Sequence, residues 1–400
     1  MNNRKIVLSV ISVIYLSFSV NAQDVKKAFS HAETQGTEML KQISLLKGVK
    51  SEDIKKQLLV SPRTLEEGVL KLVPSKDWTS GFFPGELWYL YEYTKNPEWL
   101  AAAKAFTANI EQEKFNAGTH DMGFKIYCSF GNGYRLTKDE KYKEVIIQAA
   151  KTLATRFNPK VGAIRSWDHN SDKWDFPVII DNMLNLELLF EATILTGDSS
   201  YHKIAVTHAN TTLKNHFRPD YSTYHVISYN PQTGAVEKKN THQGYSHESA
   251  WSRGQAWGLY GYTLCYRYTK NKAYLEQAQN IAKYIFTHKN LPSDLIPYWD
   301  FDAPEIPKEP RDVSAATVIA SALYELSTYS TDTKSYIEKA NKILKNLAKS
   351  YSSENGANKG FLLLNSTGSK PNKGEVDVPL IYADYYYLEA LLRSNNLKMN

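Results

Sequence analysis

One aspartate of this sequence lies in an apolar stretch, where a carboxyl group can act as a general acid. Asp181 follows four apolar residues at 177–180 and precedes Asn182, from which a helical pattern continues to Thr193. Burial disfavours the charged form of a carboxyl group and raises its pKa toward neutrality, as acid catalysis requires. The alternative is that Asp181 caps the helix that begins at Asn182. Asn185 lies one turn further along the same face and is expected to supply a hydrogen bond there.

A second acidic residue, Asp121, lies in a glycine-containing loop between His120 and Phe124. Glycine lets the backbone of such a loop approach a ligand closely, and the neighbouring imidazole can orient an anion or a hydroxyl group. The alternative is an Asx turn, because aspartate near glycine is common in turns. Two carboxylates combined with aromatic platforms are the equipment of a glycosidase.

The segment 246–262 combines a guanidinium group with aromatic rings in a helical pattern. Arg253 and Trp257 are one turn apart, so their side chains face the same way. A guanidinium can grip a carboxylate at two points, and an indole ring can stack on a sugar, so the pair suits a uronic acid. The alternative is a core tryptophan beside an arginine that reaches out to water. His225 and Gln243 add neutral hydrogen-bonding groups.

Sequence signals for other chemistries are missing. The histidines show no HxH or HExxH spacing, and neither Cys128 nor Cys265 has a second thiol or an imidazole at metal-ligand spacing. The sequence has no nucleophile elbow and no glycine-rich phosphate loop. We therefore predict neither a metal nor a cofactor. The two cysteines can form one disulfide or stay unlinked and buried, and the sequence leaves this choice open.

Composition and charge favour a carbohydrate ligand over a nucleic acid. The 400 residues include 27 tyrosines and 8 tryptophans, and such flat amphipathic rings line sugar-binding clefts as well as large cores. The formal net charge of +6 is mildly basic, which suits either an anionic ligand or an ordinary protein surface. No long basic run of the nucleic-acid type occurs.

The first residues predict export. Arg4 and Lys5 precede an apolar stretch at 6–20 that ends in a small-residue cleavage pattern, as in a secretory signal peptide. The stretch is shorter than the roughly 20 apolar residues that span a membrane. We therefore expect removal of residues 1–22, a mature chain of residues 23–400 without membrane association, and a periplasmic or extracellular location.

The mature chain repeats a helical unit that must position these residues. The sequence Tyr-Glu-Tyr-Thr-Lys-Asn at 91–96 returns as Tyr-Arg-Tyr-Thr-Lys-Asn at 266–271, and weaker copies lie between and after them. Each copy ends one apolar segment and precedes another whose apolar residues recur three and four apart, as in amphipathic helices. Such helices are predicted at 142–157, 201–217, 274–288 and 336–347. Helical pairs repeated about six times without capping repeats are expected to close into a ring. We predict an all-α fold, a single-domain (α/α)6 barrel of six helical hairpins.

The connections between the pairs carry the aromatic, acidic and glycine residues. One of them, at 224–229, alternates in the manner of a strand, and a turn follows it at 230–234, so we predict a small hairpin within a loop. The loops at one end of the barrel are therefore expected to form the site.

Five segments, in this order and spacing, resemble the unsaturated glucuronyl hydrolases of glycoside hydrolase family 88. They are 77–85 (DWTSGFFPG), 120–124 (HDMGF), 180–186 (IDNMLNL), 242–244 (HQG) and 252–258 (SRGQAWG). The resemblance covers most of the mature chain. It implies an (α/α)6 barrel with a deep pocket at one end, in agreement with the repeat.

The resemblance also implies a role for each matching residue. Asp181 is the implied general acid and base, and Asp121 a second essential carboxylate near the sugar ring. The implied substrate contacts are Trp78, Trp167, His225, Gln243, Arg253 and Trp257, with His120 in support. Tyr382 lies in a C-terminal stretch that also looks like the family's, and it is expected to close the pocket.

The implied substrate is an oligosaccharide, with or without sulfate, that ends in a 4,5-unsaturated uronate of glycosaminoglycan or ulvan type. Asp181 would protonate carbon 4, and the same carboxyl would then take a proton from the water that adds at carbon 5. The resulting hemiketal opens and releases the remaining sugar, without a cofactor. A loop with Ser366, Ser369, Lys370 and Lys373 is expected either to meet an anionic group on the next sugar or to be a flexible lysine loop.

Three other functions fit the same barrel, since a fold does not fix a function. An unsaturated rhamnogalacturonyl hydrolase would act on pectin fragments, although the HQG and SRGQAW segments favour the glucuronyl group. A lyase or a hydrolase of saturated sugars would not consume the double bond. A non-catalytic exported sugar-binding barrel would tolerate the change Asp181→Asn.

Overall fold

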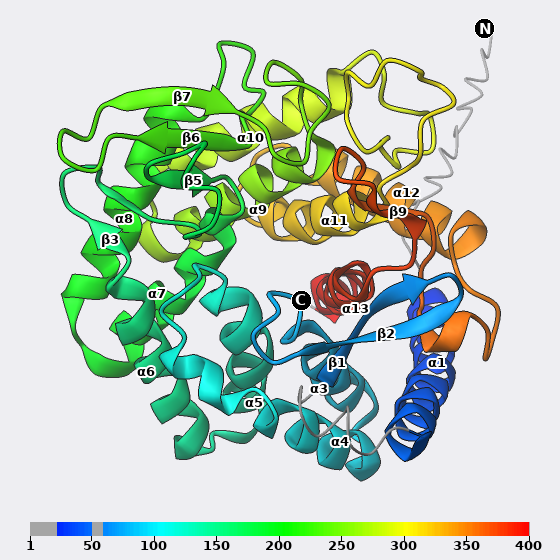
Figure 1. Cartoon of the computed structure of the whole chain (residues 1–400). Helices are drawn as coiled ribbons and strands as arrows, with labels where there is room; N and C mark the ends of the chain where they lie inside the picture. Colours follow the sequence, from blue (N-terminus) through cyan, green and yellow to red (C-terminus); the bar gives the residue numbers. More distant parts are fainter. Residues whose placement is uncertain (1–21, 50–58, 400) are drawn as a thin grey trace, which may run out of the picture.

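The computed structural model describes residues 22–49 and 59–399 and shows a ring of helices inside a second ring (Figure 1). The inner ring consists of α3 (Phe82–Thr94), the π-helix η2 (Gly123–Gly131) with its continuation α5 (Asn132–Thr137), α7 (Asn182–Thr196), α9 (Ser252–Thr269), α11 (Val313–Ser327) and α13 (Ile381–Met399). The outer ring consists of α1 (Ala22–Val49), α4 (Pro97–Ala108), α6 (Glu140–Ala154), α8 (Ser199–Asn215), α10 (Lys272–Thr287) and α12 (Thr333–Ser350). The predicted (α/α)6 barrel is confirmed.

The burial of the helices follows their place in the two rings. All 15 residues of the inner helix α11 are buried. In the outer helix α12, buried residues recur three and four apart along one face, at Tyr336, Ala340, Ile343, Leu344 and Leu347. Each inner helix contacts the next, and α13 contacts α3, so the inner ring is closed.

The repeated Thr-Lys-Asn sequence is the turn between an inner helix and its outer partner. In the first copy, the Thr94 hydroxyl donates to the carbonyl four residues back at 2.7 Å and accepts the N–H of Asn96 at 3.2 Å. Lys95 takes the left-handed conformation that ends the helix, with φ 59°. The Asn96 side chain then caps the next helix. Related turns at 137–139 and 269–271 make the same contacts.

The predicted helices at 142–157, 201–217, 274–288 and 336–347 are found as α6, α8, α10 and α12. The sixth pair differs from a hairpin, because its inner helix α13 comes from the C-terminal part of the chain and its outer helix α1 from the N-terminal part. The repeat did not indicate this pairing, since α1 contains no copy of the turn sequence.

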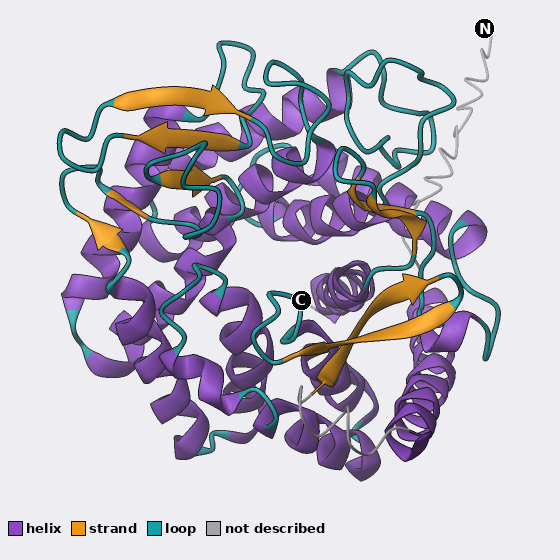
Figure 2. Ribbon diagram, viewed as in Figure 1, coloured by secondary structure: helices purple, strands orange, loops and turns teal. Residues whose placement is uncertain are grey.

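Short strands lie in the connections between the helices (Figure 2). The predicted hairpin is confirmed as β6 (Val226–Tyr229) and β7 (Val236–Asn240), and β5 (Pro177–Ile179) adds a third strand to it. Three further antiparallel pairs are β1 (Leu59–Glu66) with β2 (Val69–Pro74), β3 (Phe157–Asn158) with β4 (Ala163–Ile164), and β8 (Ser366–Ser369) with β9 (Gly374–Val378). The short 3-10 helices η1 (Glu111–Phe115) and η3 (Asn358–Gly360) complete the connections.

Two open points of the sequence concern the cysteines and the N-terminus. Cys128 and Cys265 are both buried and free, so they do not form a disulfide. Among residues 22–49 and 59–399, no helix combines the length and the apolar character needed to cross a bilayer. The predicted signal segment at 1–22 lies outside the described residues except for Ala22.

Candidate active site

The predicted site residues gather where the inner helices begin. Asp181 directly precedes α7, Arg253 and Tyr382 are the second residues of α9 and α13, and Asp121 lies two residues before η2. Trp78 lies in the turn between β2 and α3. Since the inner helices run in the same direction around the ring, their first turns meet at one end of the barrel.

The Asp181 carboxyl group is buried and does not cap its helix. Asp181 occupies the N-cap position of α7, but its side chain makes no capping hydrogen bond, so the alternative role of a cap is wrong. Its Oδ2 atom is buried and has no hydrogen-bond partner among the described residues. Burial raises the pKa of Asp181 to about 7, and the Asp121 charge adds to this, whereas the charge of Arg253 and the indole of Trp257 act in the opposite direction.

His225 faces the free oxygen of Asp181 with an N–H group. Its Nδ1 accepts the backbone N–H groups of His242 and Gln243 at 3.1 and 3.2 Å. Burial holds the pKa of His225 well below its usual range, so the ring is neutral and its proton lies on Nε2. Nε2 is 3.6 Å from Asp181 Oδ2. The HQG segment therefore contributes through its backbone, which fixes the His225 tautomer.

The Asp121 carboxylate is held by its loop and remains partly accessible. Its Oδ2 accepts the Thr119 hydroxyl at 2.7 Å, and its Oδ1 lies 3.3 Å from His120 Nε2. Burial lowers the pKa of His120. The Asp121 side chain is 17% exposed. Both carboxylate oxygens thus have protein partners, and the group remains partly exposed.

Asn185 holds the Asp121 loop instead of reaching a ligand. Its Oδ1 accepts the Phe124 N–H at 3.0 Å, and its Nδ2 lies 3.5 Å from His120 Nδ1. Asn185 is completely buried. Both ends of the amide thus have protein partners, which gives Asn185 a positioning role for the Asp121 loop.

The Arg253 guanidinium is tied to protein groups more extensively than we expected. Arg253 is 1% exposed, which excludes the alternative in which it reaches water. Its Nη1 donates to Asp312 Oδ2 and to the Thr367 carbonyl, each at 2.6 Å, and its Nη2 donates to the Gly368 carbonyl. Gln243 Nε2 donates to the same carbonyl at 3.0 Å. The expected two-point grip on a ligand carboxylate therefore cannot use Nη1, which already has two acceptors.

Aromatic rings wall the site. Tyr382 is buried under Arg253, whose guanidinium lies 5.4 Å from its ring centre, and beside Trp78, whose ring is 4.9 Å away. Trp257 packs on Phe124 at 5.2 Å. Trp167 stacks on His169 and contacts the rings of Trp174, His225 and His242.

Several buried polar atoms of this site lack a partner among the described residues. They are Asp181 Oδ2, His225 Nε2, Trp167 Nε1, Trp257 Nε1, the Tyr382 hydroxyl and both ends of the Gln255 amide. Buried polar groups are nearly always hydrogen-bonded in native proteins, so such a concentration is typical of a ligand site. Gln255 was not among the predicted site residues, although it lies within the SRGQAW segment.

The hydroxyl-rich and basic loop is anchored in the structure. The Lys370 ammonium pairs with Glu309 and lies 5.4 Å from the centre of the Trp299 ring. Glu309 also accepts the Trp299 N–H at 2.7 Å. The Asn372 amide donates to the Ser369 hydroxyl. The alternative of a flexible lysine loop therefore does not hold for Lys370, whose charge is already paired.

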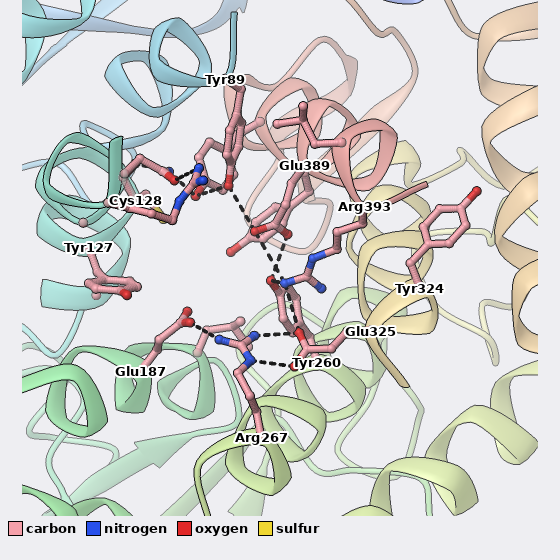
Figure 3. A pocket seen from close by; sticks show the side chains of 18 of the residues that line it. Tyr89, Tyr127, Cys128, Glu187, Tyr260, Arg267, Tyr324, Glu325, Glu389 and Arg393 are labelled. Carbon is pink, nitrogen blue, oxygen red and sulfur yellow. Dashed lines mark hydrogen bonds and ion pairs between the residues drawn. The ribbon is translucent and has the colours of Figure 1, made fainter. Parts of the chain in front are cut away.

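A separate cavity of about 580 Å³ lies at the opposite end of the barrel (Figure 3). The inner helices supply tyrosines, glutamates and arginines to it. Arg267 pairs with Glu187 and Glu325, and Arg393 pairs with Glu325 and Glu389. None of the predicted site residues lines this cavity. Nowhere in the described part of the chain do three His, Cys, Asp or Glu side chains group as a metal site would require.

The chain is similar to known carbohydrate-active proteins. Residues 51–395 match Glycosyl Hydrolase Family 88. An unsaturated glucuronyl hydrolase of Formosa agariphila is 54% identical over 336 residues, which are 84% of this chain and 84% of that protein. The crystal structure of an unsaturated glucuronyl hydrolase specific for heparin has a TM-score of 0.88 and 46% identity, and covers 94% of this chain and 98% of its own. A Streptococcus agalactiae unsaturated glucuronyl hydrolase mutant, D175N, complexed with dGlcA-GalNAc6S, has a TM-score of 0.76 and 28% identity and covers 98% of both chains.

Proposed function

Since the chain belongs to glycosyl hydrolase family 88, we propose that it is a glycosidase that removes a terminal 4,5-unsaturated glucuronic acid from oligosaccharides. The observation that carries the proposal is the buried Asp181 carboxyl. Its pKa of about 7 keeps about half of this carboxyl protonated at neutral pH, and its free oxygen faces the N–H of a neutral His225. A proton donor of this strength suits attack on a carbon–carbon double bond.

The chemistry is the hydration of an enol ether. Asp181 gives its proton to carbon 4 of the unsaturated sugar, and positive charge develops at carbon 5 and the ring oxygen. The Asp121 carboxylate, which is partly exposed beside Asp181, stabilises this charge. Water then adds to carbon 5 and loses a proton to the Asp181 carboxylate. The hemiketal opens, the bond to the remaining sugar breaks, and Asp181 is protonated again.

His225 supports both states of Asp181 without exchanging a proton. Its Nε2–H can donate to Oδ2 when the carboxyl has lost its proton, and burial prevents the imidazole from becoming charged. A second proton donor would compete for carbon 4, whereas a neutral hydrogen-bond donor stabilises the carboxylate that forms during the reaction.

The substrate class is glycosaminoglycan or ulvan fragments from lyases. The similar heparin-specific hydrolase makes heparin disaccharides the first to test. We propose that sulfate on the second sugar is tolerated and is not required, because the Lys370 charge is already paired with Glu309. The second candidate, a hydrolase of unsaturated pectin fragments, needs the same acid and differs in the sugar that it releases.

The test follows the ultraviolet absorbance of the ene-carboxylate while the purified protein acts on unsaturated disaccharides from chondroitin, heparin, ulvan and pectin digests. We expect the wild type to remove the absorbance and Asp181→Asn to lose at least about 1,000-fold in rate, as when a general acid is removed. Asp198→Asn is the matched control, because Asp198 is exposed and caps α8, a position where asparagine is equally good.

Each outcome of the absorbance test separates the candidate functions. Preference for the pectin fragment would move the assignment to the second candidate. Persistent absorbance with every substrate would overturn the proposal in favour of a lyase or a sugar-binding barrel. Full activity of Asp181→Asn would show instead that another group is the acid.

A further inference from the structure

A buried ion pair joins two inner helices at the site. Arg253 at the beginning of α9 and Asp312 directly before α11 meet at 2.6 Å, and their side chains are 1% and 0% exposed. Nothing in the sequence pattern connects these residues, which are 59 positions apart. Asp312 was therefore not among the predicted site residues.

Asp312 is held rigidly because its two carboxylate oxygens have separate tasks. Oδ1 accepts the N–H groups of Ser314 and Ala315 at 3.1 and 3.4 Å, so it caps α11. The same oxygen accepts the Ser314 hydroxyl at 2.6 Å. Oδ2 is thereby left to Arg253, and its position is set by the start of the helix.

Arg253, held in place by Asp312, acts on two parts of the site. Its Nη groups hold the Thr367 and Gly368 carbonyls and so fix strand β8. Its charge also favours the carboxylate form of Asp181 and opposes the effect of burial. Arg253 thus exerts a positive charge on the general acid. The negative charge of Asp312 partly compensates that positive charge.

We propose that Asp312 is a positioning residue that fixes the Arg253 guanidinium and strand β8 relative to Asp181. The inference rests on the proposed function, since it concerns the acid of that reaction. A carboxylate is needed here, because an arginine buried without a partner is strongly unfavourable.

Replacing Asp312 by asparagine separates its two tasks. Asparagine caps a helix as well as aspartate does, so the start of α11 is retained while the negative charge is lost. The groups that act on Asp181 are Asp121 before η2, Arg253 and Trp257 on α9, and the neutral His225 before β6. Of these, Arg253 is the group that pairs with Asp312. Without Asp312 its charge is less compensated, so ionisation of Asp181 becomes easier.

The experiment measures kcat/KM of Asp312→Asn against pH by loss of the ene-carboxylate absorbance. We expect kcat/KM to fall at least about tenfold, and the alkaline limb to move to lower pH by about one unit, the scale of shift that a nearby charge produces. The limb moves in this direction because the acid must be protonated to act.

Glu325→Gln is the matched control. Glu325 pairs with Arg267, so the same two helices α9 and α11 carry a second arginine–carboxylate pair at the opposite end of the barrel (Figure 3). We expect this variant to lose thermal stability and to keep the wild-type pH profile.

Asp312→Glu tests the inference even if Asp312→Asn does not fold. It retains the charge but moves the carboxylate, so we expect a wild-type alkaline limb together with a raised KM. An unshifted limb in Asp312→Asn, or wild-type kcat/KM in Asp312→Glu, would overturn the inference. Loss of absorbance by the wild type in the same assay shows that the proposed function itself holds.

Discussion

Burial of the Asp181 carboxyl group suits it to acid catalysis but lowers the free energy of unfolding at neutral pH. Its pKa rises from 3.8 in an exposed group to about 7 in the folded protein. At pH values between these two, the folded state binds a proton that the unfolded chain has lost. The free energy of unfolding therefore falls as the pH rises through this window, and it stays lower above it.

The change Asp181→Asn is accordingly expected to stabilise the protein while it abolishes activity. The gain is small at pH 4 and reaches about 1–4 kcal/mol above pH 7, given that one pKa unit corresponds to about 1.4 kcal/mol. Thermal unfolding of both proteins between pH 4 and pH 8 measures the difference. A gain that does not depend on pH would mean that the Asp181 pKa is not raised.

At the scale of single residues, the sequence indicated which side chains belong to the site but not which groups they bind. Asp181 was recognisable because a charged residue interrupts an apolar run. The tautomer of His225 depends on two backbone N–H groups from a distant loop, which no residue type reveals. The Arg253–Asp312 pair depends likewise on the contact between α9 and α11, and therefore on the closed ring.

At the scale of elements, the packing of the first residues of η2 on α7 determines the position of the Asp121 loop. A Cβ added at Gly123 would come within 2.7 Å of the Asn185 Cα and 2.8 Å of its Oδ1. The same Oδ1 accepts the Phe124 N–H. The two elements approach this closely only because residue 123 has no side chain.

Gly123→Ala is expected to push the Asp121 loop away from α7. We expect a loss of about 1–3 kcal/mol in stability, as for other overpacked sites, and at least about a tenfold loss in kcat/KM, because small misplacements of catalytic groups are costly. Urea unfolding and the absorbance assay measure the two effects.

Gly197→Ala is the control, since Gly197 ends α7 with φ 76° and an added Cβ meets nothing within 4 Å. It is expected to lose about 1 kcal/mol through backbone strain alone and to keep wild-type kinetics. Equal activity losses in the two variants would mean that α7 stability, and not the position of Asp121, controls the rate.

The helices were predictable because each turn signal is local. Threonine, lysine and asparagine in the turn make all their contacts within a few residues. The hairpin of β1 and β2 carries no such signal and was not predicted. Arg63 of β1 pairs with Asp77, 14 residues away, and with Glu375, 312 residues away.

At the scale of the whole molecule, the barrel offers its two ends different chemistry. The first turns of the inner helices hold the candidate acid and its aromatic walls, whereas the cavity at the other end is lined by a network of paired charges. A substrate therefore meets the acid from one end of the barrel, which suits removal of a terminal sugar.

We propose that the whole chain works outside the cytoplasm. The motif at the first residues predicts cleavage after Ala22, and we expect the protein purified from the periplasm or the medium to begin at Gln23. Mass spectrometry of the intact protein measures this directly. A full-length mass in the cytoplasmic fraction would contradict the proposal.

The sixth helical pair also sets the order in which the molecule can assemble during synthesis. Its inner helix α13 follows the other elements of the described chain, and it fills the gap between α11 and α3. Tyr382, a wall of the site, arrives with it. A growing chain thus has five pairs and an open ring, and neither the closed ring nor the complete site exists until α13 has been made.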